Sequence, residues 1–215
     1  MATRTQLERK LNIFFKEKKA MIVGKAPARI NLINPLDAVE ADYWAPAMAI
    51  SSEENPLSAY CFIKPSEGTF SKITLYEIQE GFASIKQHEV FHRKLKILVK
   101  KSIKDMEENI FIGSLEYLFY KIPEFKEYLG EKEIEIGIVS TIPRQSGISG
   151  SSALIIALMW TLGNYCKLHE KNPQEFKTIP FNRDVVGELA TEIENNVIKN
   201  TAGYGDRQPP GYTRN

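Results

Sequence analysis

The apolar positions at the start of the chain follow a helical spacing. Within residues 5–18 they are Leu7, Leu11, Phe14 and Phe15, and most of the residues between them are charged or polar. This spacing collects the apolar side chains on one face of a helix. We therefore predict an amphipathic helix within residues 1–20 that packs on the rest of the domain.

The pattern then changes to short apolar runs separated by turn residues, which is typical of β-strands. The first run, residues 21–33, reads as a strand that is broken at Pro27. Further strands are predicted at residues 47–51, 57–63 and 72–78. The front half of the chain is therefore expected to be rich in β-structure.

Between residues 91 and 121 the spacing is helical again and supports one or two helices. The basic run of residues 93–104 is interpreted as the solvated face of these helices. Residues 133–140 alternate isoleucine with charged or small residues, which predicts a half-buried strand. A last helix is predicted at residues 182–199. These elements indicate an α+β domain whose mixed sheet is covered on one side by helices.

Composition and charge narrow the classes of function. The chain has 215 residues, of which 43% are hydrophobic and 26% charged, and its formal net charge is only +1. Such a balance gives no electrostatic basis for nucleic acid or an anionic membrane as a partner. No apolar run approaches the roughly 20 residues that cross a bilayer. We expect a globular, cytoplasmic protein and assign Cys61 and Cys166, which lie far apart in the sequence, to core packing.

Residues 143–153 carry the strongest chemical signal in the chain. They read Pro-Arg-Gln-Ser-Gly-Ile-Ser-Gly-Ser-Ser-Ala and lead from the predicted strand into an apolar stretch. Here Gly147 and Gly150 can take positive φ, and the free amides and the dipole of the following helix can hold a phosphate. Ser151 and Ser152 add an N-cap and a candidate magnesium ligand. By composition alone, a Ser/Gly-rich turn before an ordinary capped core helix explains the same residues equally well.

This loop resembles the second motif of the GHMP kinases, the superfamily of galactokinase, homoserine kinase, mevalonate kinase and phosphomevalonate kinase. The usual form is Pro-x-x-x-Gly-Leu-Gly-Ser-Ser-Ala. One extra residue lies between the first glycine and the serine pair, and this variant looks most like plant-type glucuronokinases. Residues 26–33, Ala-Pro-Ala-Arg-Ile-Asn-Leu-Ile, are similar to the first galactokinase motif. Residues 194–206 resemble the galactokinase stretch that runs from Glu-Asn to a catalytic aspartate.

The resemblance implies a ribosomal protein S5 domain 2-like fold and a kinase that depends on ATP and Mg²⁺. It implies that magnesium is ligated by Ser152 and Glu194, because hard cations take oxygen donors. A solvent-facing helix glutamate is the other interpretation of Glu194. The residues implied in nucleotide binding are Pro143, Gln145, Ser146, Gly147, Ile148, Ser149, Gly150, Ser151, Ser152 and Ala153.

The resemblance also assigns the reacting groups. Asp206 matches the aspartate that meets the acceptor hydroxyl, either as a base or by orienting the acceptor. Arg29 would neutralise charge on the transferred phosphoryl group and keep that aspartate ionised. A surface ion pair would explain this arginine as well.

The substrate is expected to be a small sugar or uronic acid. Asn34-Pro-Leu-Asp37 looks like the Asn-Pro-Ser-Asp of glucuronokinases, without the glycine that usually precedes it. Asp37 would accept hydrogen bonds from vicinal hydroxyls, and Asp42 is a second candidate. Lys25 and Arg144 are candidates for a uronic-acid carboxylate or a phosphate. The leading reaction is phosphorylation of a glucuronate-type acid at its anomeric hydroxyl, with galactose as the alternative substrate.

The end of the chain departs from the family pattern. Residues 207–215 contain two prolines and no apolar periodicity, which predicts a divergent or disordered tail. Residues 21–206 would then form the N-terminal ATP-binding domain, without the C-terminal domain of GHMP kinases. Such a fragment would expose apolar surface and self-associate. A catalytically inactive domain that keeps a nucleotide or sugar pocket is the alternative function.

Overall fold

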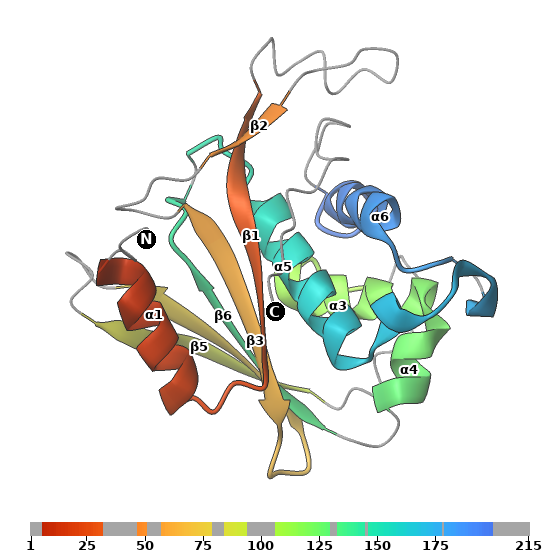
Figure 1. The fold of residues 1–215 in the computed structure, drawn as a ribbon, viewed down its shortest axis with the longest axis horizontal. Coiled ribbons are helices and arrows are strands. Elements are labelled where there is room, and N and C mark those ends of the chain that lie inside the picture. Colours follow the sequence, from red (N-terminus) through yellow and green to blue (C-terminus); the bar gives the residue numbers. More distant parts are fainter. Residues whose placement is uncertain are drawn as a thin grey trace.

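The structure, a computed structural model, describes residues 6–31, 47–50, 57–78, 84–93, 106–129, 133–144, 146–177 and 179–199. Within these residues six strands form one sheet in the order β2-β1-β3-β6-β4-β5 (Figure 1). They are β1 (Ile22–Asn31), β2 (Ala47–Ile50), β3 (Ser58–Pro65), β4 (Ser71–Ile78), β5 (Ile85–Arg93) and β6 (Ile134–Ser140). Neighbouring strands are antiparallel except β4 and β6, which are parallel. The predicted mixed sheet and α+β class are confirmed.

Helices lie on both faces of this sheet (Figure 1), whereas the sequence predicted cover on one side only. One face carries α3 (Ile110–Lys121), α4 (Pro123–Leu129), α5 (Gly150–Tyr165) and α6 (Arg183–Asn196), with short 3-10 turns at Leu168–Glu170 and Pro173–Glu175. The opposite face carries α1 (Gln6–Glu17), the predicted N-terminal helix. Among the described residues, none of the helices has the length and apolar character needed to cross a membrane.

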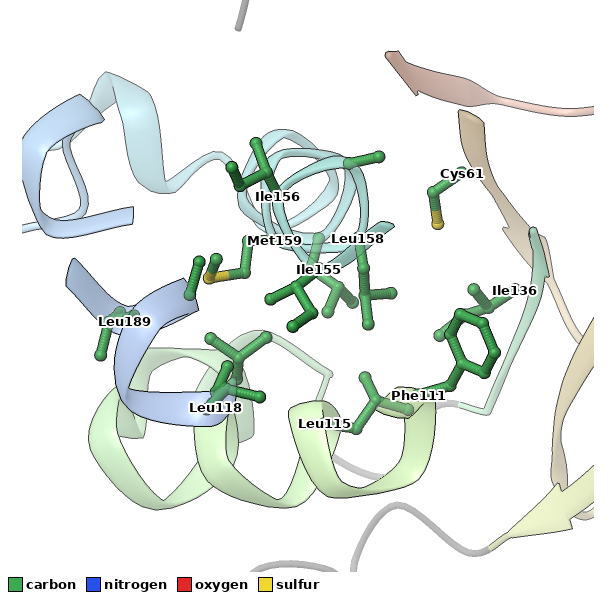
Figure 2. Close-up of a cluster of buried hydrophobic side chains, with 14 of the residues drawn as sticks. Cys61, Phe111, Leu115, Leu118, Ile136, Ile155, Ile156, Leu158, Met159 and Leu189 are labelled. Carbon is green, nitrogen blue, oxygen red and sulfur yellow. The ribbon is translucent and has the colours of Figure 1, made fainter. Parts of the chain in front are cut away.

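Helix α5 is the centre of the main core. It is apolar along almost its whole length and is therefore buried on most sides. Figure 2 shows its side chains enclosed by the sheet, α3 and α6. The predicted core positions of Cys61 and Cys166 are confirmed, and burial raises the pKa of each thiol to about 12. The side chains labelled in the view are Ile155, Ile156, Leu158 and Met159 of α5, Phe111, Leu115 and Leu118 of α3, Leu189 of α6, and Cys61 and Ile136 of the sheet.

A second, aromatic core holds α1 on the other face. Phe14 of α1 lies edge-on to Tyr76 and to Phe62, with ring centroids 4.9 and 5.9 Å apart. Edge-to-face pairs of this kind add to the stabilisation that burial provides. The four apolar residues predicted to form the buried face of this helix, Leu7, Leu11, Phe14 and Phe15, are all buried.

Strand β1 continues through Pro27, so the predicted break is wrong. The amide of Ala28 donates to the carbonyl oxygen of Leu57, at the β3 side, over 2.7 Å. Since successive amides point to opposite sides of a strand, the nitrogen of Pro27 points to the other side, where the described part of the chain pairs β2 with residues 28–31 and not with Pro27. A proline at such an open edge removes no hydrogen bond from the sheet.

Strand β6 was predicted to be half-buried, but both of its faces are covered. Its isoleucines face the main core, whereas Val139 belongs to the aromatic core beneath α1. Gly137 lies under the ring of Phe62, its partner in β3. The alternation in this strand predicts one solvent-exposed face. That face is buried because α1, which is distant in the sequence, packs on it.

Strand β5 was not predicted, and its residues 91–93 were assigned to a helix. It is a largely exposed edge strand, so it carries little of the apolar alternation by which strands are detected. Helix α3 confirms the later part of the predicted helical region, and α4 was not predicted. Most of the basic run, residues 94–104, lies outside the described residues.

The close contact of β1 with α5 predicts a severe effect of Gly24→Ala. A Cβ atom at this position would lie 2.9 Å from the carbonyl oxygen of Ala157 and closer still to Oγ1 of Thr161. Because the α5 backbone would have to shift to make room for this Cβ atom, we expect the free energy of unfolding in urea to fall by about 1–3 kcal/mol. Gly68→Ala is the matched control, since its nearest neighbour would be 3.7 Å away. Equal stability of the two variants would contradict this account.

Candidate active site

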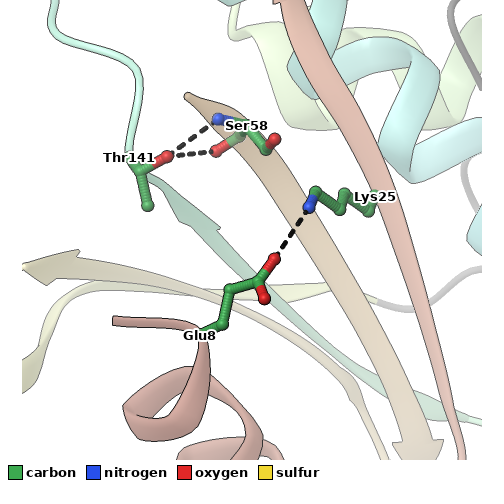
Figure 3. Close-up of polar contacts among 4 residues, drawn as sticks. All are labelled: Glu8, Lys25, Ser58 and Thr141. Carbon is green, nitrogen blue, oxygen red and sulfur yellow. Dashed lines mark hydrogen bonds and ion pairs between the residues drawn. The ribbon is translucent and has the colours of Figure 1, made fainter. Parts of the chain in front are cut away.

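The segment between β6 and α5 is fixed to the sheet where it begins. The amide of Thr141 donates to the carbonyl oxygen of Ser58 over 2.9 Å. Its Oγ1 accepts from the amide of Ser58 at 2.8 Å and donates to the same carbonyl at 3.1 Å (Figure 3). These contacts tie the end of β6 to the start of β3, so the loop leaves the sheet in a defined direction.

The loop reaches α5 through two residues with left-handed backbone conformations. Gly147 has a φ of 71°, as predicted, and Ser149 has a φ of 59°. Gly150 was also predicted to have a positive φ, and this is wrong because α5 begins at this residue with helical backbone. The second left-handed position therefore falls one residue earlier, on a serine.

The first turn of α5 differs from those of α3 and α6. Asn109 caps α3 by accepting from the amides of Phe111 and Ile112, and Asn182 caps α6 by accepting from the amide of Val185. The residue at the N-cap position of α5, Ser149, makes no side-chain capping hydrogen bond. The Ser149 side chain therefore leaves the first amides and the positive dipole end of α5 available to an anion.

Glu194 of α6 joins the two serines that follow this cap. It is buried, with 2% of its surface exposed, so the solvent-facing interpretation is wrong. The hydroxyl of Ser151 donates to its Oε1, and that of Ser152 donates to its Oε2 over 2.8 Å. The predicted N-cap role of the serine pair is also wrong, because both hydroxyls point to this carboxylate from within the first helical turn.

Arg29 of β1 completes this group of buried polar residues. Its Nε and Nη2 donate to Oγ of Ser149 over 3.2 and 2.8 Å, and its amide donates to the carbonyl oxygen of Ile148 over 3.1 Å. Burial lowers the pKa of the guanidinium, and the attraction of the Glu194 carboxylate opposes this effect. Arg29 is only 9% exposed, so the alternative interpretation as a surface ion pair is wrong.

A cavity of about 850 Å³ opens beside the loop. The loop and the start of α5 form one wall, β4 and β5 form another, and the start of α3 closes it. Leu75, Ile110 and Ile138 provide apolar surface, while His88 and Glu77 provide polar atoms, with Nδ1 and Oε2 3.8 Å apart. These two polar residues had no signal in the sequence, because they face each other only once the unpredicted β5 pairs with β4.

Of the other residues singled out in the sequence, some lie at the cavity and one lies on the opposite face of the sheet. Arg144, Pro143 and Ser146 line the cavity, but Lys25 lies on the α1 face of the sheet, where its Nζ donates to Oε1 of Glu8 over 3.4 Å (Figure 3). Lys25 is therefore not part of this group. The remaining candidates, Asn34, Asp37, Asp42, Gln145 and Asp206, lie outside the described residues.

Comparison with known families and solved structures finds proteins that share this architecture. Residues 109–212 match the family described as GHMP kinases N terminal domain. This region, slightly less than half of the chain, is therefore similar to the N-terminal domain of GHMP kinases. A search of curated proteins found no match. The match covers α3, the loop, α5 and Glu194, but not Arg29 of β1 or the cavity wall formed by β4 and β5.

Solved structures of GHMP kinases share the fold of this domain at low sequence identity. Lactococcus lactis galactokinase complexed with galactose is 21% identical, with a TM-score of 0.58 over 94% of this chain and 45% of its own. A D-glycero-D-manno-heptose 1-phosphate kinase from Bacteroides thetaiotaomicron is 17% identical, with a TM-score of 0.54 over 86% of this chain and 51% of its own. Streptococcus pneumoniae phosphomevalonate kinase, in complex with phosphomevalonate and AMPPNP, is 10% identical, with a TM-score of 0.54 over 87% and 46%. The chain thus spans about half the length of these kinases.

The donor atoms at the start of α5 suit a magnesium ion. The described residues contain no cluster of three or more His, Cys, Asp or Glu side chains that would hold a metal by themselves. Mg²⁺ commonly takes one or two protein oxygens and completes its shell with water and substrate phosphates. Ser152 Oγ and Glu194 Oε2, which are buried and 2.8 Å apart, fit that pattern.

The proximity of opposite charges predicts energetic coupling between Arg29 and Glu194. We expect Arg29→Met and Glu194→Gln each to destabilise the fold, and the double variant to lose less than the sum, by about 0.5–3 kcal/mol. Urea unfolding of the four proteins in the cycle measures this coupling. Glu170→Gln, beyond the other end of α5, is the control and should combine additively with Arg29→Met. Additivity in both cycles would show that the two buried charges do not stabilise each other.

Proposed function

We propose that this domain binds the nucleotide in a kinase that depends on ATP and Mg²⁺ and phosphorylates a hydroxyl of a small sugar or uronic acid. One observation carries the proposal: the uncapped start of α5 faces the Gly147 loop, with the Glu194 carboxylate buried against Ser151 and Ser152. A helix start of this kind favours anions, whereas a buried carboxylate beside it favours a cation. Magnesium bound to a nucleotide phosphate satisfies both requirements.

The nucleotide would lie along the loop and into the cavity. Amides between Ser146 and Ser152, together with the dipole of α5, would hold the phosphates. The apolar surface of Leu75, Ile110 and Ile138 would receive the base, because binding sites for small molecules combine apolar walls with a few polar groups. Glu77 and His88 would supply such polar groups at the cavity wall.

Ser152 and Glu194 would hold magnesium, which when bound neutralises charge on the phosphates. Arg29, beside the loop and cationic despite its burial, would stabilise negative charge on the transferred phosphoryl group. Asp206 would orient the acceptor hydroxyl and take its proton as the new O–P bond forms, while the bond between the γ-phosphorus and the bridging oxygen breaks and ADP leaves. Phosphoryl transfer needs little more from a protein than this positioning and charge stabilisation.

The substrate class rests on the loop motif and on the related kinases. A glucuronate-type acid is the first candidate, with Asn34, Asp37 and Asp42 meeting its hydroxyls and Arg144 meeting its carboxylate. Arg144 lines the cavity beside the loop, which supports a role toward an anionic ligand. Galactose is the alternative, since the galactokinase of known structure was complexed with that sugar.

Nucleotide binding tests the first part of this proposal. In calorimetric titration of the 215-residue chain with a non-hydrolysable ATP analogue, we expect binding that strengthens with Mg²⁺. Ser152→Ala should weaken binding in Mg²⁺ by roughly 1.5–3 kcal/mol and change it little in EDTA, because the lost hydroxyl acts through the metal. Ser66→Ala removes an exposed turn hydroxyl far from the loop and is the control. Absence of binding by the folded chain would refute the nucleotide site.

Turnover tests the second part. Asp206→Asn should lower kcat roughly 10²–10⁴-fold, as expected for loss of a general base, while leaving affinity for the ATP analogue within the error of the titration. A coupled assay for ADP with glucuronate, galactose and no sugar measures both the rate and the preference. Asp184→Asn changes an exposed aspartate in the first turn of α6 and is the control. Nucleotide binding without turnover on any sugar would instead favour a catalytically inactive binding domain.

A further inference from the structure

Ser149 has a backbone conformation that is unusual at the start of a helix. Its φ and ψ of 59° and 42° lie in the left-handed region. Among the described residues, the other non-glycine residues with positive φ are Lys19, Lys167 and Lys199. Each of these lies just after the C-terminal end of a helix, where left-handed residues are common. Ser149 instead precedes α5, so its conformation calls for another explanation.

The side chain of Ser149 reaches across the loop instead of capping α5. Its Oγ accepts two hydrogen bonds from the Arg29 guanidinium, over 3.2 Å from Nε and 2.8 Å from Nη2. The neighbouring carbonyl, of Ile148, accepts from the amide of Arg29. Three hydrogen bonds thus join one residue of β1 to two adjacent loop residues that lie about 120 positions away in the sequence.

This arrangement fixes the orientation of the guanidinium. Nε and Nη2 lie on one edge of the planar group, so two bonds to one oxygen hold its plane as well as its position. A mobile arginine loses side-chain entropy when it meets a ligand. An arginine that is already ordered loses less, which favours binding and transfer in the correct geometry.

We propose that Ser149 is a positioning residue of the phosphoryl-transfer site: its hydroxyl, presented by a left-handed backbone, holds the Arg29 guanidinium beside the phosphate loop. The inference rests on the proposed kinase function, and Ser149 acts through Arg29 without needing to touch the substrate. The hydroxyl of Ser146, by contrast, stays within the loop and donates to the carbonyl oxygen of Pro143 over 2.8 Å.

Two substitutions separate the hydroxyl from the backbone. Ser149→Gly adopts the left-handed conformation freely but lacks the acceptor oxygen. Ser149→Asn tolerates the same conformation and supplies a carbonyl acceptor on a short side chain. Ser66→Ala, in the turn between β3 and β4, is the control, because its hydroxyl makes hydrogen bonds within that turn, to Gly68 and Phe70.

The first readout needs no nucleotide. The Nε–H signal of Arg29 in a ¹H–¹⁵N spectrum is identified by its absence in Arg29→Lys. We expect it to exchange slowly with water in the unmodified chain, in Ser66→Ala and in Ser149→Asn, and rapidly in Ser149→Gly. The second readout is steady-state kinetics, in which Ser149→Gly should lower kcat about 10–100-fold with KM for ATP changed less than about threefold. Ser149→Asn should restore most of the rate.

Three results would overturn the role of Ser149: an unchanged Arg29 signal in Ser149→Gly, an unchanged kcat in that variant, or failure of Ser149→Asn to restore either one. The kinase proposal fails separately, in the unmodified chain, if the folded protein does not bind the ATP analogue with Mg²⁺. That result would overturn both proposals, whereas the variant results overturn only the positioning role.

Discussion

The packing of α5 against β1 is the constraint on which the rest of the structure depends. The helix is apolar on nearly every side, so it is stable only when other elements surround it. Gly24 lets the strand approach the helix backbone closely, and α3 and α6 close the remaining sides. Because the helix is fixed along its length, its first turn points in one direction, toward the loop that follows β6.

The same packing makes the buried charges tolerable. Bringing α6 beside α5 places the Glu194 carboxylate against two serine hydroxyls, and the β1 strand brings Arg29 to the same loop. An isolated charge in such surroundings would be costly, but opposite charges and donated hydrogen bonds compensate for lost water. The site is therefore a product of helix packing, and its polar residues are held by the core that surrounds them.

Much of the fold followed from local pattern, and the errors have a common cause. The helices α1 and α6 and most strands have strong apolar periodicity, so they were predicted close to their observed bounds, whereas α5 was expected from the continuous apolar stretch after the loop. The edge strand β5 has weak periodicity and was missed, and β6 was judged half-buried because α1, which covers its second face, is far away in sequence. Pro27 was read as a break because the open edge that accommodates it arises only when β2 and β3 have paired.

The sequence by itself determined the order strand, loop, helix around Gly147, the resemblance of that loop to the GHMP kinase motif, and the candidates at positions 29, 152 and 194. Only the tertiary structure decided that the left-handed residue is Ser149, that Glu194 faces the serine pair, and that Lys25 belongs to the other face of the sheet. The physical reason is that local pattern records backbone preference and burial. Which polar groups meet is set by contacts between elements separated by tens of residues, through the twist and packing of the sheet.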